Sequence, residues 1–264
     1  MASRPYASTI GAAARLRYLG HSTVLLELDG IRILTDPLLV DRLGPLHRHS
    51  DAVDEMLEGI EADVVLISHA HHDHLHLPSL RRLRGRPQTV VPAGLGRLVE
   101  RHHEVVEVTR GQQIAIGPVR ITAMPAVHHG GRRPFGPASE ALGFHIVGSS
   151  RVYFAGDTDL FPEMADLAGH VDIALLPVWG WGPGLGGGHM DPARAAEAVV
   201  RIAPRVAIPI HWGTFYPFAL ARIWPLPLAK PPLDFAREVA RRAPGTEVRV
   251  LAPGERTEVR TDAS

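Results

Sequence analysis

The segment His69-Ala-His-His-Asp-His74 directly follows an apolar run, Asp63-Val-Val-Leu-Ile-Ser68. The run predicts a buried strand, so the pattern H-x-H-x-D-H brings three imidazoles and one carboxylate to the end of that strand. Neutral imidazole and carboxylate are the ligands that zinc and similar divalent ions prefer. The alternative is a solvated, low-complexity His tract, but such a tract does not normally follow an apolar strand. The sequence therefore predicts a metal site at this point.

Three later apolar segments also end in a metal-ligating residue. They are Ala123-Met-Pro-Ala-Val-His128, Arg151-Val-Tyr-Phe-Ala-Gly-Asp157 and Val206-Ala-Ile-Pro-Ile-His211. Ligands at the ends of adjacent strands converge on one edge of a sheet, and a two-metal site takes roughly seven protein ligands. Together with the first segment, these strand ends predict a dinuclear centre.

The order and spacing of these motifs resemble the metallo-β-lactamase-fold hydrolases, from about Leu16 to about Leu251. Four further stretches are similar to the branch that holds N-acylphosphatidylethanolamine-hydrolysing phospholipase D and L-ascorbate-6-phosphate lactonase. They are Gly20-His-Ser-Thr-Val24 leading to Leu34-Thr-Asp-Pro37, Pro125-Ala-Val-His128 with Arg132 just after, His189-Met-Asp-Pro192, and His211-Trp-Gly-Thr-Phe215. The resemblance implies an α+β fold, a four-layer αββα sandwich, with residues 1–264 as a single hydrolase domain.

The resemblance also implies a ligand set for two divalent ions, with zinc favoured and manganese or iron compatible with the same donors. The first ion would take His69, His71 and His128, and the second Asp73, His74 and His211, while Asp157 bridges both. His129 is the alternative to His128, but the Pro125-Ala-Val-His128 match favours the first, and strand alternation sends the next side chain elsewhere.

Other residues are expected to act beside these ligands. The ions would share a hydroxide, which Asp73 aims at the substrate. His189 follows a Gly-rich loop and is expected to contact the substrate as an oxyanion stabiliser or proton donor. Arg132 is a candidate partner for a phosphate or carboxylate, with a plain surface arginine as the alternative. His21 and Asp36 are expected next to the ligands, Asp36 orienting an imidazole, and Asp159 is a candidate for the same role.

Composition limits the classes of protein that fit. The 264 residues suit one large domain or two small ones, and no apolar run approaches the ~20 residues of a membrane span. The start of the chain lacks the apolar stretch of a signal peptide, and the chain has no Cys, so we expect a cytoplasmic protein whose metals bind His and carboxylates. Lys and Arg total 28 and Asp and Glu total 28, a balance that argues against nucleic-acid binding.

Periodicity and turn residues predict the order of the elements. Strands are expected at 14–19, 22–28, 31–35, 63–68, 88–91, 104–108, 113–116, 118–124, 141–148, 151–155, 171–176, 205–210 and 246–251. Helices are expected near 51–58, 78–84, 93–101, 160–168, 192–202 and 233–242, with the Pro-rich segment 217–232 as a surface excursion.

These observations favour a metal-dependent hydrolase of a small-molecule phosphodiester, lactone or other ester. The alternatives are a nuclease of the same fold, similar to ribonuclease Z, and a non-catalytic metal-binding protein. The sequence leaves the oligomeric state open. Segments 37–60 and 217–232 are candidate lid or interface elements, through which a homo-oligomer could form.

Overall fold

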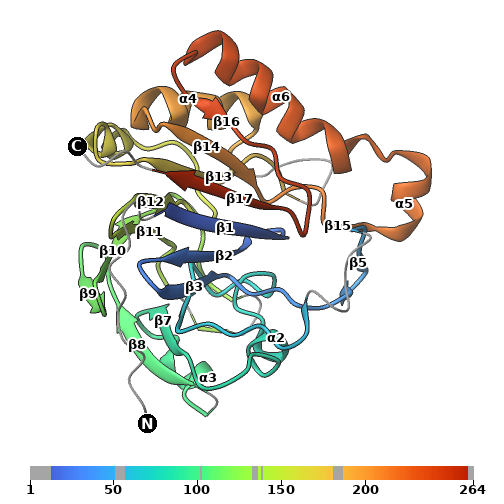
Figure 1. The fold of residues 1–264 in the computed structure, drawn as a ribbon. Helices are drawn as coiled ribbons and strands as arrows, with labels where there is room; N and C mark the ends of the chain where they lie inside the picture. Colours follow the sequence, from blue (N-terminus) through green and yellow to red (C-terminus); the bar gives the residue numbers. More distant parts are fainter. Residues whose placement is uncertain are drawn as a thin grey trace.

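The fold contains two seven-stranded sheets, and the alternating apolar residues near the start of the chain form strands of the first (Figure 1). The computed structural model describes residues 13–50, 57–101, 103–132, 136–137, 139–180 and 187–260. The first sheet has the order β17-β1-β2-β3-β6-β7-β8, antiparallel as far as β3 and parallel from β3 to β8. Its strands are β1 Ala13–Gly20, β2 Thr23–Leu28, β3 Ile31–Thr35, β6 Val64–Leu66, β7 Gln88–Pro92, β8 Glu104–Val108 and β17 Arg256–Arg260.

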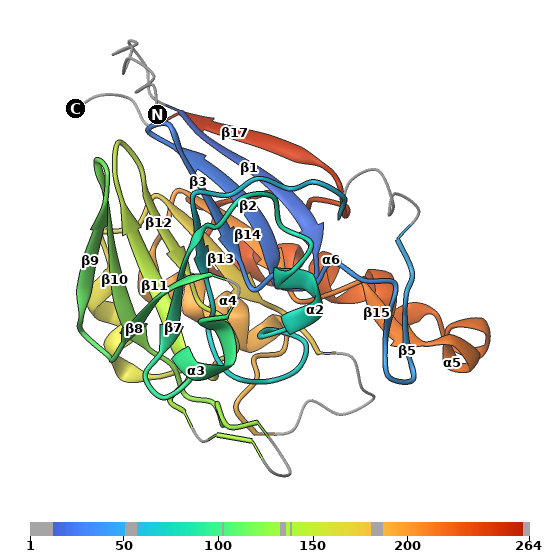
Figure 2. The same ribbon diagram turned by 90° about the horizontal axis from the view of Figure 1, so that it is seen from below.

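The second sheet mirrors this plan, with the order β16-β14-β13-β12-β11-β10-β9. Its strands are β9 Gln113–Ile116, β10 Val119–Pro125, β11 Leu142–Val147, β12 Arg151–Phe154, β13 Ile173–Pro177, β14 Val206–Ile210 and β16 Glu247–Val248. A small third sheet joins β4 Arg42–Leu43, β5 Leu46–Arg48 and β15 Phe215–Pro217. Figure 2 shows the third sheet and α5 (Phe218–Ile223) projecting together from one side.

Three apolar clusters stack the elements into four layers. Leu16, Leu26 and Phe144 belong to the cluster between the two sheets. A second cluster covers the outer face of the first sheet with α2 (Leu77–Leu80) and α3 (Gly96–Val99). A third covers the outer face of the second sheet with the 3₁₀ helix η1 (Pro162–Leu167), α4 (Pro192–Ile202) and α6 (Leu226–Arg242). The predicted αββα sandwich is therefore confirmed.

Helix α4 is the helix expected at 192–202, and it begins with a side-chain cap. Asp191 accepts a hydrogen bond from the backbone N–H of Arg194 at 2.8 Å, and Pro192 occupies the first turn, where its missing N–H costs nothing. The apolar face of the helix, with Ala195, Val199 and Ile202, is buried against the second sheet.

Two expectations about the chain are wrong. The helix expected near 233–242 begins earlier, at Leu226, and continues through Pro231 and Pro232, so the surface excursion 217–232 is largely helical. The expectation also missed β17, which pairs antiparallel with β1 and supplies an edge strand of charged residues. Most of the helix expected near 51–58 lies outside the described residues. No helix in the described part of the chain is long and apolar enough to cross a membrane.

Candidate metal centre

The carboxyl ends of several strands deliver the predicted site residues to one edge of the sandwich. His69 follows β6, His128 follows β10, Asp157 follows β12 and His211 follows β14. Gly156 shapes this edge: its φ is +60°, and a Cβ there would lie 2.7 Å from the Cβ of Ser68. Only glycine therefore lets the strand ends of the two sheets approach so closely just before Asp157.

One group of imidazoles lies on the β6 and β10 side. His69, His71 and His128 each present a ring nitrogen, and the three nitrogens lie within 4.8 Å of one another. Nε2 of His128 is 3.2 Å from Nδ1 of His71. Two nitrogens that bind the same tetrahedral zinc ion lie about 3.3 Å apart, so the observed distance suits two ligands of one ion. His129 is exposed and in none of the candidate groups among the described residues, so the geometry favours His128.

A second group combines a carboxylate with three imidazoles. It contains Asp73, His74 and His211, as predicted, and also His21. Nε2 of His21 is 3.0 Å from Oδ2 of Asp73, and its ring centroid is 4.0 Å from that of His211. The sequence placed His21 only beside the ligands, so its position inside this group is new. His21 has a φ of +55°, which turns the chain sharply after β1.

Asp157 lies between the two groups. Its Oδ2 is 3.2 Å from Nε2 of His74, and its Oδ1 is 3.3 Å from Nε2 of His211. His189 completes the cluster, with Nδ1 3.6 Å from Oδ2 of Asp157 and its ring 4.6 Å from that of His128. The structure thus brings together the seven predicted ligands and His189.

A buried hydrogen-bond network fixes which nitrogen of His69, His74 and His128 faces the cluster. Asp36 is fully buried and accepts hydrogen bonds from Ser68 Oγ at 2.6 Å and from His74 Nδ1 at 2.7 Å. Because the Ser68 hydroxyl donates to Asp36, it accepts from Nδ1 of His69 at 2.9 Å. His128 Nδ1 donates to the carbonyl of Gly188 at 2.9 Å. In each of these three rings Nδ1 holds a proton, so Nε2 is the nitrogen that faces the cluster and would bind a metal.

The atoms at the centre of the cluster fit a metal. Several are fully buried and have no hydrogen-bond partner in the described part of the chain, which is costly for polar groups. They are His69 Nε2, His74 Nε2, His189 Nδ1, Asp157 Oδ1 and both ring nitrogens of His211. A divalent cation would satisfy several of these atoms at once, and their nitrogen and oxygen donors suit zinc, manganese or iron.

The titration behaviour of the cluster points the same way. Burial and the neighbouring His211 lower the pKa of His21 to about 3, and burial with His128 lowers the pKa of His71 to about 4. Burial also lowers the pKa of His69, His128 and His189. Metal ligation needs neutral imidazoles, so these rings are in the required state near neutral pH.

The carboxylates and imidazoles of the centre shift one another's pKa values. Burial opposes ionisation of Asp157, but His211 and His74 outweigh it and lower the pKa of Asp157 well below its usual range. Burial likewise opposes protonation of His74, yet Asp157, Asp73 and Asp36 raise its pKa well above its ordinary value. Positive charge is therefore strongly favoured here, as a cation site requires.

Two predicted neighbours of the site make other contacts. The guanidinium of Arg132 donates to the carbonyls of Ala70 at 3.3 Å and Leu75 at 3.0 Å, and lies 2.7 Å from Nδ1 of His72. It therefore braces the His-rich loop. Asp159 does not orient a ligand: it accepts a hydrogen bond from Nε of Arg194 at 2.6 Å near the surface. The sequence could not distinguish these contacts, because they depend on how the loops fold.

Fold and cluster together define a class, a metallo-β-lactamase-fold protein with a His and Asp centre able to hold metal. A family model described as "Beta-lactamase superfamily domain" matches residues 31–212. The chain belongs to the metallo-β-lactamase superfamily, in the UPF0173 family of metal-dependent hydrolases.

Three similar proteins illustrate this membership. A UPF0173 metal-dependent hydrolase of Aeropyrum pernix is 33% identical over 92% of this chain and 96% of its own length. An uncharacterized protein of Mycobacterium tuberculosis is 32% identical over 94% of this chain and 70% of its own length. The structure of Igni18, a metallo hydrolase from Ignicoccus hospitalis, has a TM-score of 0.72 at 26% identity, covering 93% of this chain and 98% of that one.

Proposed function

We propose that this chain hydrolyses a small-molecule phosphodiester, lactone or other ester with the help of two divalent metal ions, zinc foremost. The observation that carries the proposal is the convergence of buried, unpartnered nitrogen and oxygen atoms around Asp157. His69, His71 and His128 would hold one ion, and Asp73, His74 and His211 the other, with Asp157 between them. Because strands of both sheets supply these ligands, we propose that residues 1–264 form a single hydrolase domain.

When bound, the ions would supply Lewis acidity that makes a water molecule nucleophilic near neutral pH. The chain's own residues would then orient the reactants. The side chain of Asp73 is 13% exposed and that of Asp157 only 2%, so Asp73 is the more accessible of these two carboxylates. Asp73 would accept a hydrogen bond from the attacking water and aim it, while His21 holds Oδ2 of Asp73 in place.

His189 is the best candidate for the proton donor. Its side chain is 24% exposed, against 0% for His74 and 1% for His211. An imidazole that faces both the cluster and solvent can protonate a leaving oxygen or stabilise charge that develops on the substrate. Arg132 was predicted to bind the substrate, but its contacts support a different role, in which it holds the loop that carries His71 and Asp73.

The substrate class is supported by the branch motifs and not by the fold. At 21% identity, the diiron β-hydroxylase CmlA has the same fold with a TM-score of 0.65, so the fold alone does not fix the chemistry or the metal.

Elemental analysis of the purified protein tests the proposed metals, and turnover of bis(p-nitrophenyl) phosphate beside a panel of lactones tests the reaction. Asp157→Ala should retain at most one ion, because Asp157 would contribute to holding both. Two tightly bound ions in that variant would refute the bridging role. Absence of bound metal from the wild-type protein would refute the proposal.

A further inference from the structure

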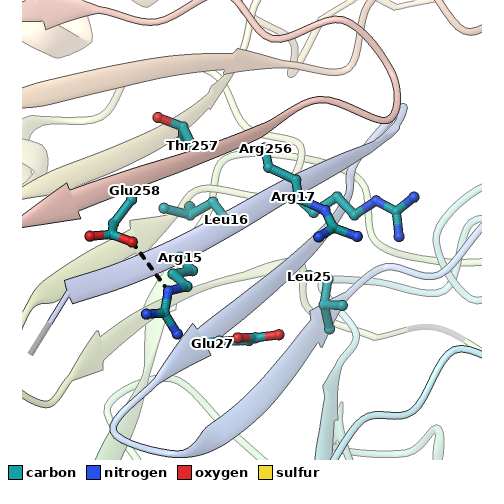
Figure 3. Close-up of a pocket in the computed structure, with 8 residues that line it drawn as sticks. All are labelled: Arg15, Leu16, Arg17, Leu25, Glu27, Arg256, Thr257 and Glu258. Atoms are coloured by element: carbon teal, nitrogen blue, oxygen red, sulfur yellow. Dashed lines mark hydrogen bonds and ion pairs between the residues drawn. The ribbon is translucent and has the colours of Figure 1, made fainter.

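An exposed pocket lies on the outer face of the first sheet, away from the metal centre. On β1 the side chains of Arg15 and Arg17 point to this face, while the alternating Leu16 is buried between the sheets. The apolar cluster beneath α2 and α3 covers the neighbouring strands, and β17, β1 and the outer end of β2 remain open. Figure 3 shows the resulting pocket, of about 410 Å³.

Two arginines stand directly opposite each other at one end of this pocket. Arg17 on β1 pairs in register with Arg256 on β17. Side chains in such cross-strand positions lie about 5 Å apart at Cβ, and like charges there are destabilising. Figure 3 shows both side chains at the same end of the pocket.

Neither guanidinium has an ion pair or hydrogen bond within the described ranges, and Nε of Arg17 is fully buried without a partner. Burial and the charge of Arg256 together lower the pKa of Arg17.

The other arginines on this face are paired, so the feature is specific to these two. Nε of Arg15 is 3.2 Å from Oε2 of Glu258, and Nε of Arg260 is 2.8 Å from Oε1 of the same residue. Arg32 pairs with Asp63 at 3.1 Å.

We propose that Arg17 and Arg256 form a binding site for the phosphate group of a small anionic ligand. Each guanidinium offers five N–H donors in a planar fork. A phosphate monoester carries a charge of about −1.5 to −2 and three acceptor oxygens, so it can neutralise both arginines at once. A carboxylate, with a single charge, matches only one arginine.

The rest of the pocket limits where the phosphate can lie. The carboxylates of Glu27 and Glu258 line the pocket around Arg15 and would repel an anion there. The phosphate is therefore confined to the end with Arg17 and Arg256. Leu25 provides an apolar wall near this end, and the volume is within the range of small-molecule sites.

Titration calorimetry of the metal-loaded protein with inorganic phosphate, and separately with glycerol 3-phosphate, tests this site at constant ionic strength. Arg17→Gln and Arg256→Gln should each weaken binding by about tenfold to a hundredfold, the usual worth of hydrogen bonds to a charged group. The matched control is Arg260→Gln, on the same face of β17, which should change the Kd less than about twofold. Phosphate bound at the metal centre would add a second binding component that is the same in every variant, so the Kd compared is that of the component outside the metal centre, fitted with a two-site model.

Thermal unfolding gives a second readout that does not depend on the ligand assay. In chloride buffer Arg256→Gln should raise Tm, because it removes the charge opposite Arg17. Added phosphate should reverse that order by stabilising the wild-type protein more. Tighter binding of glycerol 3-phosphate than of inorganic phosphate would assign an organic ligand to the pocket. An unchanged Kd in Arg256→Gln, or an equal loss in Arg260→Gln, would overturn the proposal.

Discussion

Replacing Asp36 with Asn tests whether a buried carboxylate behind the cluster controls its affinity for metal. Asp36 is fully buried and accepts three hydrogen bonds, from the backbone N–H and hydroxyl of Ser68 and from Nδ1 of His74. Asn keeps the shape and tolerates the φ of +32° at this position. The Asn amide, however, has one acceptor oxygen and one NH₂ donor group. The NH₂ group would therefore face a donor, on either Ser68 or His74, and that pair could not form a hydrogen bond.

The expected magnitude follows from these contacts. Loss of such an outer partner typically lowers metal affinity 10–100-fold, which is about 1.4–2.7 kcal/mol. The metal-free protein should also lose about 1–3 kcal/mol of unfolding free energy, the usual cost of leaving one buried donor unsatisfied.

Competition with a chelator measures the metal Kd, and urea unfolding of the metal-free protein measures the stability. Asp159→Asn is the control, because Asp159 lies two residues after Asp157 but bonds to Arg194 near the surface. It should leave the Kd unchanged. Wild-type affinity for both ions in Asp36→Asn would refute the reasoning that this carboxylate orients and polarises His74.

Three further outcomes are expected. His128→Ala should lose metal and activity while His129→Ala stays close to wild type; the reverse ranking in elemental analysis and turnover would transfer the ligand role. His189→Ala should keep its metals yet lose about 10²–10⁴ in turnover, with a smaller loss for p-nitrophenolate leaving groups; metal loss would make His189 structural instead. Burial raises the pKa of Asp172, but hydrogen bonds from Arg151 outweigh it and the net pKa is lowered. Asp172 therefore stabilises the fold above its unfolded pKa of about 3.9, and this contribution disappears as pH falls further. The urea midpoint of Asp172→Asn should lie below wild type at pH 7 and approach it below pH 4, and a gap that stays constant with pH would contradict the assignment.

The strands were predictable wherever apolar residues alternate with polar ones or form a continuous run in the sequence. The alternating run of β1 and the continuously apolar β13 and β14 are unambiguous, and their ends placed the site residues correctly along the sheets. β17 escaped prediction because three of the five residues of Arg256–Arg260 are charged, and only its pairing with β1 makes it a strand. Tertiary context decides such edge strands.

Proline signals misled the interpretation near the end of the chain. Pro231 and Pro232 argue against a helix locally, yet α6 continues through them. The apolar residues Phe235 and Val239 anchor this helix in the core of the outer layer, which outweighs the local cost.

The contacts behind the metal centre depend on backbone turns that no pattern reveals. His21, Asp36 and His211 all have positive φ, and these turns aim His21 at Asp73 and Asp36 at His74. The sequence could therefore indicate which side chains gather at this edge, but not the exact partners that hold them.

The pairing of β1 with β17 has a consequence for how the chain reaches its fold. Arg15 donates a hydrogen bond to Glu258, 243 positions later in the sequence. Strand β1 therefore gains its second neighbouring strand only when β17 pairs with it. Closing so large a loop is entropically slow, and contacts of this kind delay folding. During synthesis, β1 leaves the ribosome early and must wait with one edge open. The same closure brings the described ends of the chain together, and a permuted gene that joins them with a short linker should therefore fold faster without altering the metal centre.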